Sequence, residues 1–199
     1  MPRFKGWVVK LGGSLAQAPE LPAWLKILAT TAEPCVVVPG GGPFTRATRE
    51  MQQHWDYPDA AAHPMAILGM AQFGLMLQAL EPRLAAASSV AALQARPDHV
   101  GCTVWLPSLD DVALMDDLPA DWRVSADSLA LWLMAQLGGT DLALVKAISH
   151  RPSLGVLELA AAGVVDPFFP SLHARVACRL EIFGRHEMAR LAATLGHSE

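Results

Sequence analysis

Short apolar runs that end at glycine recur along the chain. Residues 7–11 (WVVKL) lead into Gly12-Gly13-Ser14, and residues 35–38 (CVVV) lead into Pro39 and three consecutive glycines. A strand buried on both faces of a parallel sheet is continuously apolar, and its carboxyl end passes into a loop. The runs therefore predict buried strands, and similar patterns predict further strands at 84–90, 103–106, 142–147 and 178–183.

Apolar residues between these runs follow helical spacing. Helices are expected at 21–31, 45–55, 91–96, 126–137, 154–162 and 186–195. A longer helix begins after the turn at 58–62, and its residues 65–80 are apolar on more than one face, which indicates a buried helix or the seam of a homodimer. This stretch falls short of the roughly 20 apolar residues that span a bilayer. The acidic segment 110–121 is expected to form a surface loop.

The alternation of strands and helices indicates an α/β protein. It predicts a three-layer αβα sandwich with a mostly parallel central sheet. A chain of 199 residues is long enough for one well-buried domain and short for two, so residues 1–199 are expected to form a single domain.

Composition excludes several classes of function. The formal net charge of −4 offers no basic footprint for nucleic acid or an anionic membrane. The three cysteines are isolated, and the histidines lack metal-ligand spacing, so neither a disulfide scaffold nor a structural zinc site is expected. The N-terminus lacks the apolar core of a secretory signal, and a cytoplasmic location is expected.

Two glycine-rich loops are the first sign of a functional site. Glycine at the carboxyl end of a strand lets backbone N–H groups approach an anion, and the helix that follows adds its positive dipole end. Each loop alone is a common structural turn, whereas the pair is a stronger signal. Neither loop matches the P-loop or GxGxxG pattern, which disfavours a nicotinamide enzyme.

Lysines within apolar strands strengthen this prediction. Lys10 lies just before the first glycine loop and Lys146 near the end of the 142–147 run, where an unpaired ammonium would be costly to bury. Each could instead extend to solvent at a strand edge. Two cations at neighbouring strand ends could stabilise charge on a transferred phosphoryl group. Asp127, near Ser125, either caps the following helix or holds both lysines.

Four segments, in this order, resemble the amino-acid kinase superfamily: VVKLGGSL, VVVPGGGPF, VSADSLALWLMAQL and LALVKA. That superfamily includes kinases of acetylglutamate, aspartate, uridylate and isopentenyl phosphate, and has an αβα sandwich fold. The TDVDG motif usual after the late strand is replaced here by VKAISH.

The resemblance implies roles for particular residues. Lys10 would contact the transferred phosphoryl group, and Asp127 would orient the catalytic lysine. Gly12 and Gly13, with Ser14, would form the nucleotide phosphate loop, and Gly41 and Gly42, with Gly40, the loop on the substrate side. Lys146 is assigned to the nucleotide and to catalysis from its position. ATP and Mg²⁺ are the expected cofactors, with the acceptor mainly on residues 1–120 and the nucleotide mainly on 121–199.

A narrower resemblance is to the small kinases of methanofuran biosynthesis. It is carried by DWRVSADSLALWLMAQL, MAILGMAQFGLML and GVVDPFFP and by the shortness of the chain. It implies ATP-dependent phosphorylation of [5-(aminomethyl)furan-3-yl]methyl phosphate. Another kinase of the superfamily, acting on a phosphomonoester or a carboxylate, and a regulatory module that only binds nucleotide are the alternatives.

Such an acceptor needs cations for its phosphate and an acid for its amine. Arg46 and Arg123 are candidates for the phosphate, although surface arginines are common. Asp166 could meet the amine or help to hold magnesium, although Asp before Pro167 also suits a turn. Trp122 and the other tryptophans are interpreted as core or interface packing. A phosphorylated small molecule and ATP are the expected partners, within a homo-oligomer, with a dimer favoured.

Overall fold

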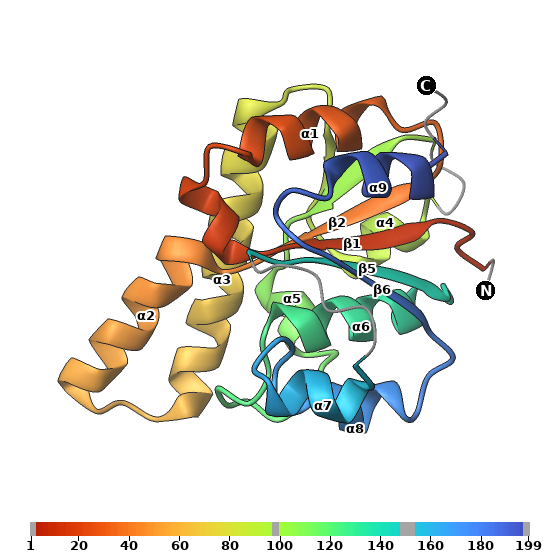
Figure 1. The fold of residues 1–199 in the computed structure, drawn as a ribbon. Coiled ribbons are helices and arrows are strands. Elements are labelled where there is room, and N and C mark those ends of the chain that lie inside the picture. The colour runs from red at the N-terminus through yellow and green to blue at the C-terminus, as the bar shows by residue number, and fades with distance from the viewer. Residues whose placement is uncertain (1–2, 97–99, 148–153, 197–199) are drawn as a thin grey trace.

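A computed structural model describes residues 3–96, 100–147 and 154–196. Within them, six parallel strands form one sheet in the order β3-β4-β2-β1-β5-β6 (Figure 1). The strands are β1 (Trp7–Leu11), β2 (Cys35–Pro39), β3 (Ala85–Ala87), β4 (Cys102–Trp105), β5 (Asp141–Val145) and β6 (Arg179–Phe183). The predicted α/β fold is confirmed, and the sheet is parallel throughout this part of the chain.

Helices cover both faces of the sheet and make three layers (Figure 1). The face above the sheet in this view carries α1 (Leu21–Thr30) and α9 (Met188–Thr194), and the face below carries α6 (Ala126–Gln136), α7 (Val156–Ala161) and α8 (Phe169–His173). The remaining helices are the 3₁₀ helix η1 (Gly13–Gln17), α2 (Gly42–Trp55), α3 (Asp59–Leu80), α4 (Val90–Gln94) and α5 (Leu109–Val112).

The alternation of side chains along β1 aims Lys10 at one particular helix. Val9 and Leu11 belong to the core between the sheet and helices α1 and α9. Val8 belongs to the core between the sheet and α6. Side chains two apart on a strand share a face, so Lys10 points to the same side as Val8. The lysine thereby faces α6.

Helix α3 is buried on one side only, which corrects the expectation of a buried helix. Ile67, Met70, Phe73 and Leu77 pack into the two cores, at the three- and four-residue spacing of one helical face. The other side exposes Met65, Leu68, Leu75 and Leu80. Because both sides are apolar, hydropathy alone could not distinguish them. A homodimer through this side stays a prediction.

By length and composition, α3 is also the one helix within the described residues that could cross a membrane. Its 22 residues include an apolar window of which 39% is buried inside this fold. Part of that burial comes from α2, which packs along α3. The packed face is the arrangement of a core helix in an α/β domain.

Segment 110–121 is not a simple surface loop, contrary to expectation. Helix α5 opens it with a capping box on Ser108, and Asp111 is buried. The Asp111 carboxylate accepts hydrogen bonds from the Val90 N–H at 2.9 Å and from the Trp105 Nε1–H at 3.1 Å. It also accepts from the Ser108 N–H at 3.1 Å. One acidic side chain thus joins three segments of the chain.

Replacing Asp111 with Ala should destabilise the fold strongly. The substitution leaves buried donors of Val90 and Trp105 without partners, and each such group costs about 1–3 kcal/mol. We expect the free energy of unfolding, measured by urea denaturation, to fall by about 3 kcal/mol. The exposed Asp116→Ala is the matched control and should change it by less than about 0.5 kcal/mol. Equal stability of the two variants would contradict this account.

Candidate functional site

The two glycine loops meet at the carboxyl ends of neighbouring strands. Strands β1 and β2 pair in register, and the Gly40 N–H donates to the Leu11 carbonyl at 2.8 Å. A Cβ on Gly13 would lie 2.3 Å from the backbone nitrogen of Gly42, and one on Gly40 would lie 2.3 Å from that of Gly13. Real Cβ atoms do not approach so closely, so this contact requires glycine at both positions.

The same edge includes the end of β5. The Gly12 N–H donates to the Val145 carbonyl at 3.0 Å, and a Cβ on Gly12 would lie 2.8 Å from that oxygen. On the other side Gly42, with φ +56°, turns the chain into α2. The ends of β2, β1 and β5 therefore converge where the sequence placed its anion-binding loops.

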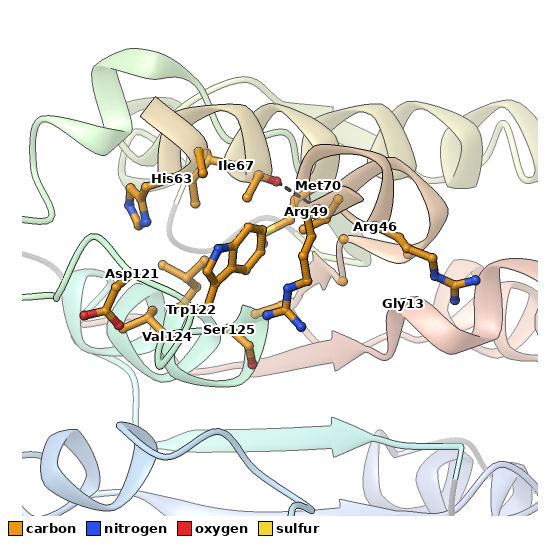
Figure 2. Close-up of a pocket in the computed structure, with 18 of the residues that line it drawn as sticks. Gly13, Arg46, Arg49, His63, Ile67, Met70, Asp121, Trp122, Val124 and Ser125 are labelled. Atoms are coloured by element: carbon orange, nitrogen blue, oxygen red, sulfur yellow. Dashed lines mark hydrogen bonds between the residues drawn. The ribbon is translucent and has the colours of Figure 1, made fainter. Parts of the chain in front are cut away.

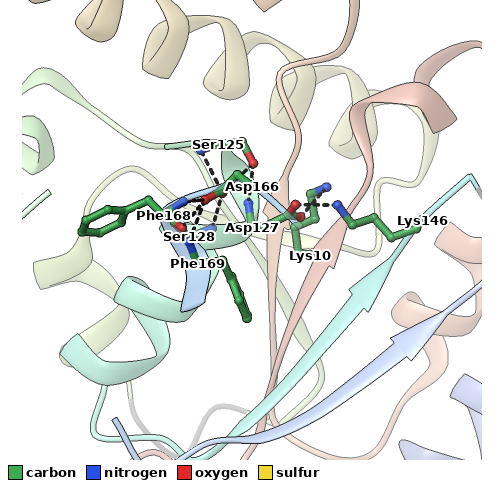
Figure 3. A network of polar contacts seen from close by, with 8 residues as sticks. All are labelled: Lys10, Ser125, Asp127, Ser128, Lys146, Asp166, Phe168 and Phe169. Atoms are coloured by element: carbon green, nitrogen blue, oxygen red, sulfur yellow. Dashed lines mark hydrogen bonds and ion pairs between the residues drawn. The ribbon is translucent and has the colours of Figure 1, made fainter. Parts of the chain in front are cut away.

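A buried cluster of two lysines and one carboxylate lies beside these loops (Figure 3). Lys10 Nζ lies 2.9 Å from Asp127 Oδ1, and Lys146 Nζ lies 2.5 Å from Asp127 Oδ2. The side chains are 7%, 15% and 3% exposed for Lys10, Lys146 and Asp127. Lys146 follows the last residue of β5, and Asp127 is in the first turn of α6.

The charges of this cluster do not balance, because two ammonium groups face one carboxylate. Burial disfavours the ionised form of Asp127, but attraction by Lys10 and Lys146 outweighs it and holds the carboxyl pKa below its usual value. Burial, followed by repulsion from Lys10, lowers the pKa of Lys146 to about 8. Lys146 therefore still carries its charge at neutral pH, and an anion at the glycine loops would compensate the excess positive charge of the cluster.

Asp166 holds the start of α6 in place. One carboxylate oxygen accepts hydrogen bonds from the Ser125 N–H, the Ser125 hydroxyl and the Ser128 N–H. The other accepts from the Ser128 hydroxyl and from the N–H groups of Phe168 and Phe169 (Figure 3). These six hydrogen bonds occupy both oxygens. Asp166 thereby fixes the start of α6, the helix that carries Asp127, and its role toward an amine or a magnesium ion stays a prediction.

A cavity of about 380 Å³ opens next to the loops, between α2, α3 and the start of α6 (Figure 2). Next to the glycine loops it is lined by Lys10, Gly13, Ser14, Gly40, Gly41, Gly42 and Thr45. The α3 side contributes Ala62, Ala66, Ile67 and Met70, and Val124, Ala126 and Leu129 lie opposite. Arg46, Arg49, Asp59, His63, Asp121, Trp122 and Ser125 complete the lining. Its surface is more apolar than polar, and Figure 2 shows Arg46 and Arg49 toward one end and His63 and Asp121 at the other.

The two arginines proposed from the sequence lie in different places. Arg46 lines the cavity. Arg123 is mostly exposed, makes an ion pair with Asp121 at 2.7 Å and is absent from the lining. Sequence reasoning missed Arg49, one helical turn beyond Arg46, and Trp122, which it assigned to packing. Arg49 could have been found from its spacing, because a residue three positions after Arg46 lies on the same face of a helix.

His63 is an uncharged polar group in the same cavity. Its partial burial lowers its pKa from the ordinary value, while the negative charge of Asp121 opposes this shift. His63 is therefore neutral at pH 7.

Within the described residues, no group of three or more His, Cys, Asp or Glu side chains could hold a metal ion. The departure at VKAISH lies partly outside the described residues, which end here at Ala147.

The Asp166→Asn variant tests the positioning role. The amide retains one oxygen but offers an NH₂ group to donors that need an acceptor, so several buried donors lose their partners. We expect the free energy of unfolding in urea to fall by about 2–4 kcal/mol. Hydrogen exchange should show the largest loss of amide protection at the start of α6. A variant as stable as the parent chain would show that these contacts do not hold α6.

Comparison with known proteins agrees with this arrangement. Residues 5–150 match the model of the amino acid kinase family. The fold is similar to UMP kinase from Bacillus anthracis (TM-score 0.69, 12% identity, covering 99% of this chain and 94% of the other). It is also similar to uridylate kinase from Archaeoglobus fulgidus (TM-score 0.68, 12% identity, covering 96% of this chain and 95% of the other). A third similar structure is UMP kinase from Ureaplasma parvum (TM-score 0.61, 14% identity, covering 92% of this chain and 90% of the other). No curated protein matches the sequence.

These identities are low, so the solved structures show a common fold and nothing about the acceptor. The family match is independent of them and includes both glycine loops, Lys10, Asp127 and Lys146. The chain belongs to the amino acid kinase family.

Proposed function

We propose that the protein transfers the γ-phosphoryl group of ATP to [5-(aminomethyl)furan-3-yl]methyl phosphate and so makes the diphosphate used in methanofuran biosynthesis. The observation that carries phosphoryl transfer is the buried Lys10–Asp127–Lys146 cluster beside the two glycine loops. A module that only binds nucleotide has little need for a lysine fixed at this junction.

The transfer is a direct, in-line displacement. A phosphate oxygen of the acceptor forms a bond to the γ-phosphorus, and the bond from that phosphorus to the bridging oxygen of ADP breaks. The acceptor phosphate is already ionised, so the reaction needs no general base. Lys10 and Lys146 stabilise the charge on the phosphoryl oxygens, and Asp127 holds both ammonium groups in place.

Magnesium would reach this site with the nucleotide. Asp127 is taken by two lysines and Asp166 by six hydrogen bonds, so neither offers a free carboxylate. Mg²⁺ commonly keeps several water ligands and binds substrate phosphates. Here it would neutralise charge on the ATP phosphates while the protein positions those phosphates through the glycine loops.

The charge distribution of the cavity supports an acceptor with a phosphate at one end and an amine at the other. Arg46 and Arg49 have no carboxylate partner among the described side chains, and Lys10 belongs to the positive cluster. Asp59, which also lines the cavity, has no cationic partner in the described part of the chain, and Asp121, at the end of the cavity away from Arg46, is paired with Arg123 (Figure 2). The stretch of α3 from Asp59 to Met70 is about 16 Å long.

The first test is ADP formation with ATP, Mg²⁺ and a panel of acceptors. The panel contains the furan phosphate, isopentenyl phosphate, UMP, N-acetylglutamate and aspartate. Turnover with the furan phosphate alone would support the proposed acceptor, whereas turnover with another member would replace it.

In the same assay Lys10→Ala should lower kcat by about 10²–10³-fold, because removal of one preorganised donor to a transition-state anion has an effect of this size. The affinity for ATP, measured by calorimetry, should change much less. Lys26→Ala removes an exposed lysine of α1 and should leave turnover unchanged. Normal turnover in the Lys10 variant would refute the catalytic assignment.

Activity should also fall at alkaline pH. The Lys146 pKa of about 8 means that the ammonium is present at pH 7 and lost as the pH rises through 8. The value of kcat/KM should therefore decline with a midpoint near pH 8, since it reports on the free enzyme. In Lys146→Arg the guanidinium stays charged, and this decline should disappear even if the rate at pH 7 is lower. An unchanged alkaline limb in that variant would assign it to another group.

A further inference from the structure

Trp122 connects two parts of the protein across the cavity. It precedes α6, yet its indole Nε1–H donates to Gln52 Oε1 of α2 at 2.5 Å. Gln52 is itself fixed, because its amide nitrogen donates to Asp59 Oδ1 at 2.7 Å and to the Tyr57 carbonyl at 3.0 Å. With both ends of the amide engaged, Gln52 holds the indole in one orientation.

Arg49 lies against the same indole. Its guanidinium carbon is 4.2 Å from the centroid of the Trp122 ring, and Arg49 is one helical turn from Gln52 on α2. A cation over an aromatic face is attracted by the ring quadrupole. Arg49 has no carboxylate partner and no hydrogen-bond acceptor among the described residues, so its N–H donors are available to an anion.

The position of this pair within the cavity gives it a function. Figure 2 shows the Trp122 indole between His63 and Asp121 at one end and Arg49 and Arg46 toward the other. Both Trp122 and Arg49 line the cavity. An aromatic ring fixed in the middle of an apolar cavity, with a guanidinium beside it, is complementary to a flat apolar group that carries an anion.

We infer that Trp122 is the specificity-determining residue of the acceptor site, and that it selects phosphomonoesters with a planar ring close to the phosphate, because the Arg49 guanidinium lies 4.2 Å from the centroid of the indole ring. The ring of the acceptor packs against the indole, and Arg49, held over Trp122, binds the phosphate. This inference deepens the proposed function and rests on it for the presence of an acceptor phosphate. It differs from the packing role expected from the sequence.

Binding of two unreactive probes tests the inference without phosphoryl transfer. Benzyl phosphate carries a planar ring, and isopentyl phosphate is a flexible aliphatic of similar length. We expect calorimetry without ATP to show about tenfold tighter binding of benzyl phosphate by the parent protein, an effect in the range of aromatic stacking. Trp122→Ala should remove this preference, and Trp122→Phe, which keeps a ring but loses the contact to Gln52, should retain part of it.

Two further variants separate selection from a general structural effect. Gln52→Leu leaves the indole without its hydrogen bond and should weaken the preference less than Trp122→Ala does. Trp55→Ala removes an exposed tryptophan from α2, outside the cavity, and should leave both affinities unchanged. Circular dichroism and urea denaturation identify any variant that has lost its fold.

The outcomes distinguish this inference from the proposed function. An unchanged preference in folded Trp122→Ala, or no binding of either probe by the parent protein, would overturn the role of Trp122. A preference that depends on Trp122, together with no ADP formation from the furan phosphate, would uphold the selection of planar phosphates and reject the proposed acceptor.

Discussion

The attraction of two lysines to one buried carboxylate is the interaction on which the site depends. Lys10 comes from β1, one of the two central strands, Lys146 follows the end of the neighbouring β5, and Asp127 comes from α6. Removing these charges from water is costly, and such clusters seldom increase stability over an apolar core. Their benefit is positional, since the carboxylate sets the distance between two cations. The excess positive charge then favours an anion at the neighbouring loops.

Two structural features keep this cluster in place. The six hydrogen bonds to Asp166 fix the start of α6, and therefore the carboxylate that both lysines contact. The contact between Gly13 and Gly42 brings the two loops closer than any side chain would allow. Lysines and loops are thus held by independent contacts. A site built in this way needs little reorganisation when charge develops during transfer.

Much of the fold could be predicted from local pattern. The runs at residues 7–11 and 35–38 became β1 and β2 within one residue of the expected bounds, because strands buried on both faces must be apolar throughout. Segment 110–121 and the exposed side of α3 were predicted wrongly. Asp111 is buried because distant donors of Val90 and Trp105 meet it, and α3 is exposed on one apolar side. Neither relation is visible in neighbouring residues.

The sequence by itself determined the glycine loops, the strand lysine Lys10 and the family, since each depends on residue types at fixed local spacing. Only the tertiary structure decided which charged groups meet. It assigned Asp166 to the start of α6, removed Arg123 from the cavity, and placed Arg49 beside Trp122, which lies 73 positions further along the chain. Side chains far apart in the sequence become neighbours through packing of the sheet and helices, and their local spacing carries no record of that contact.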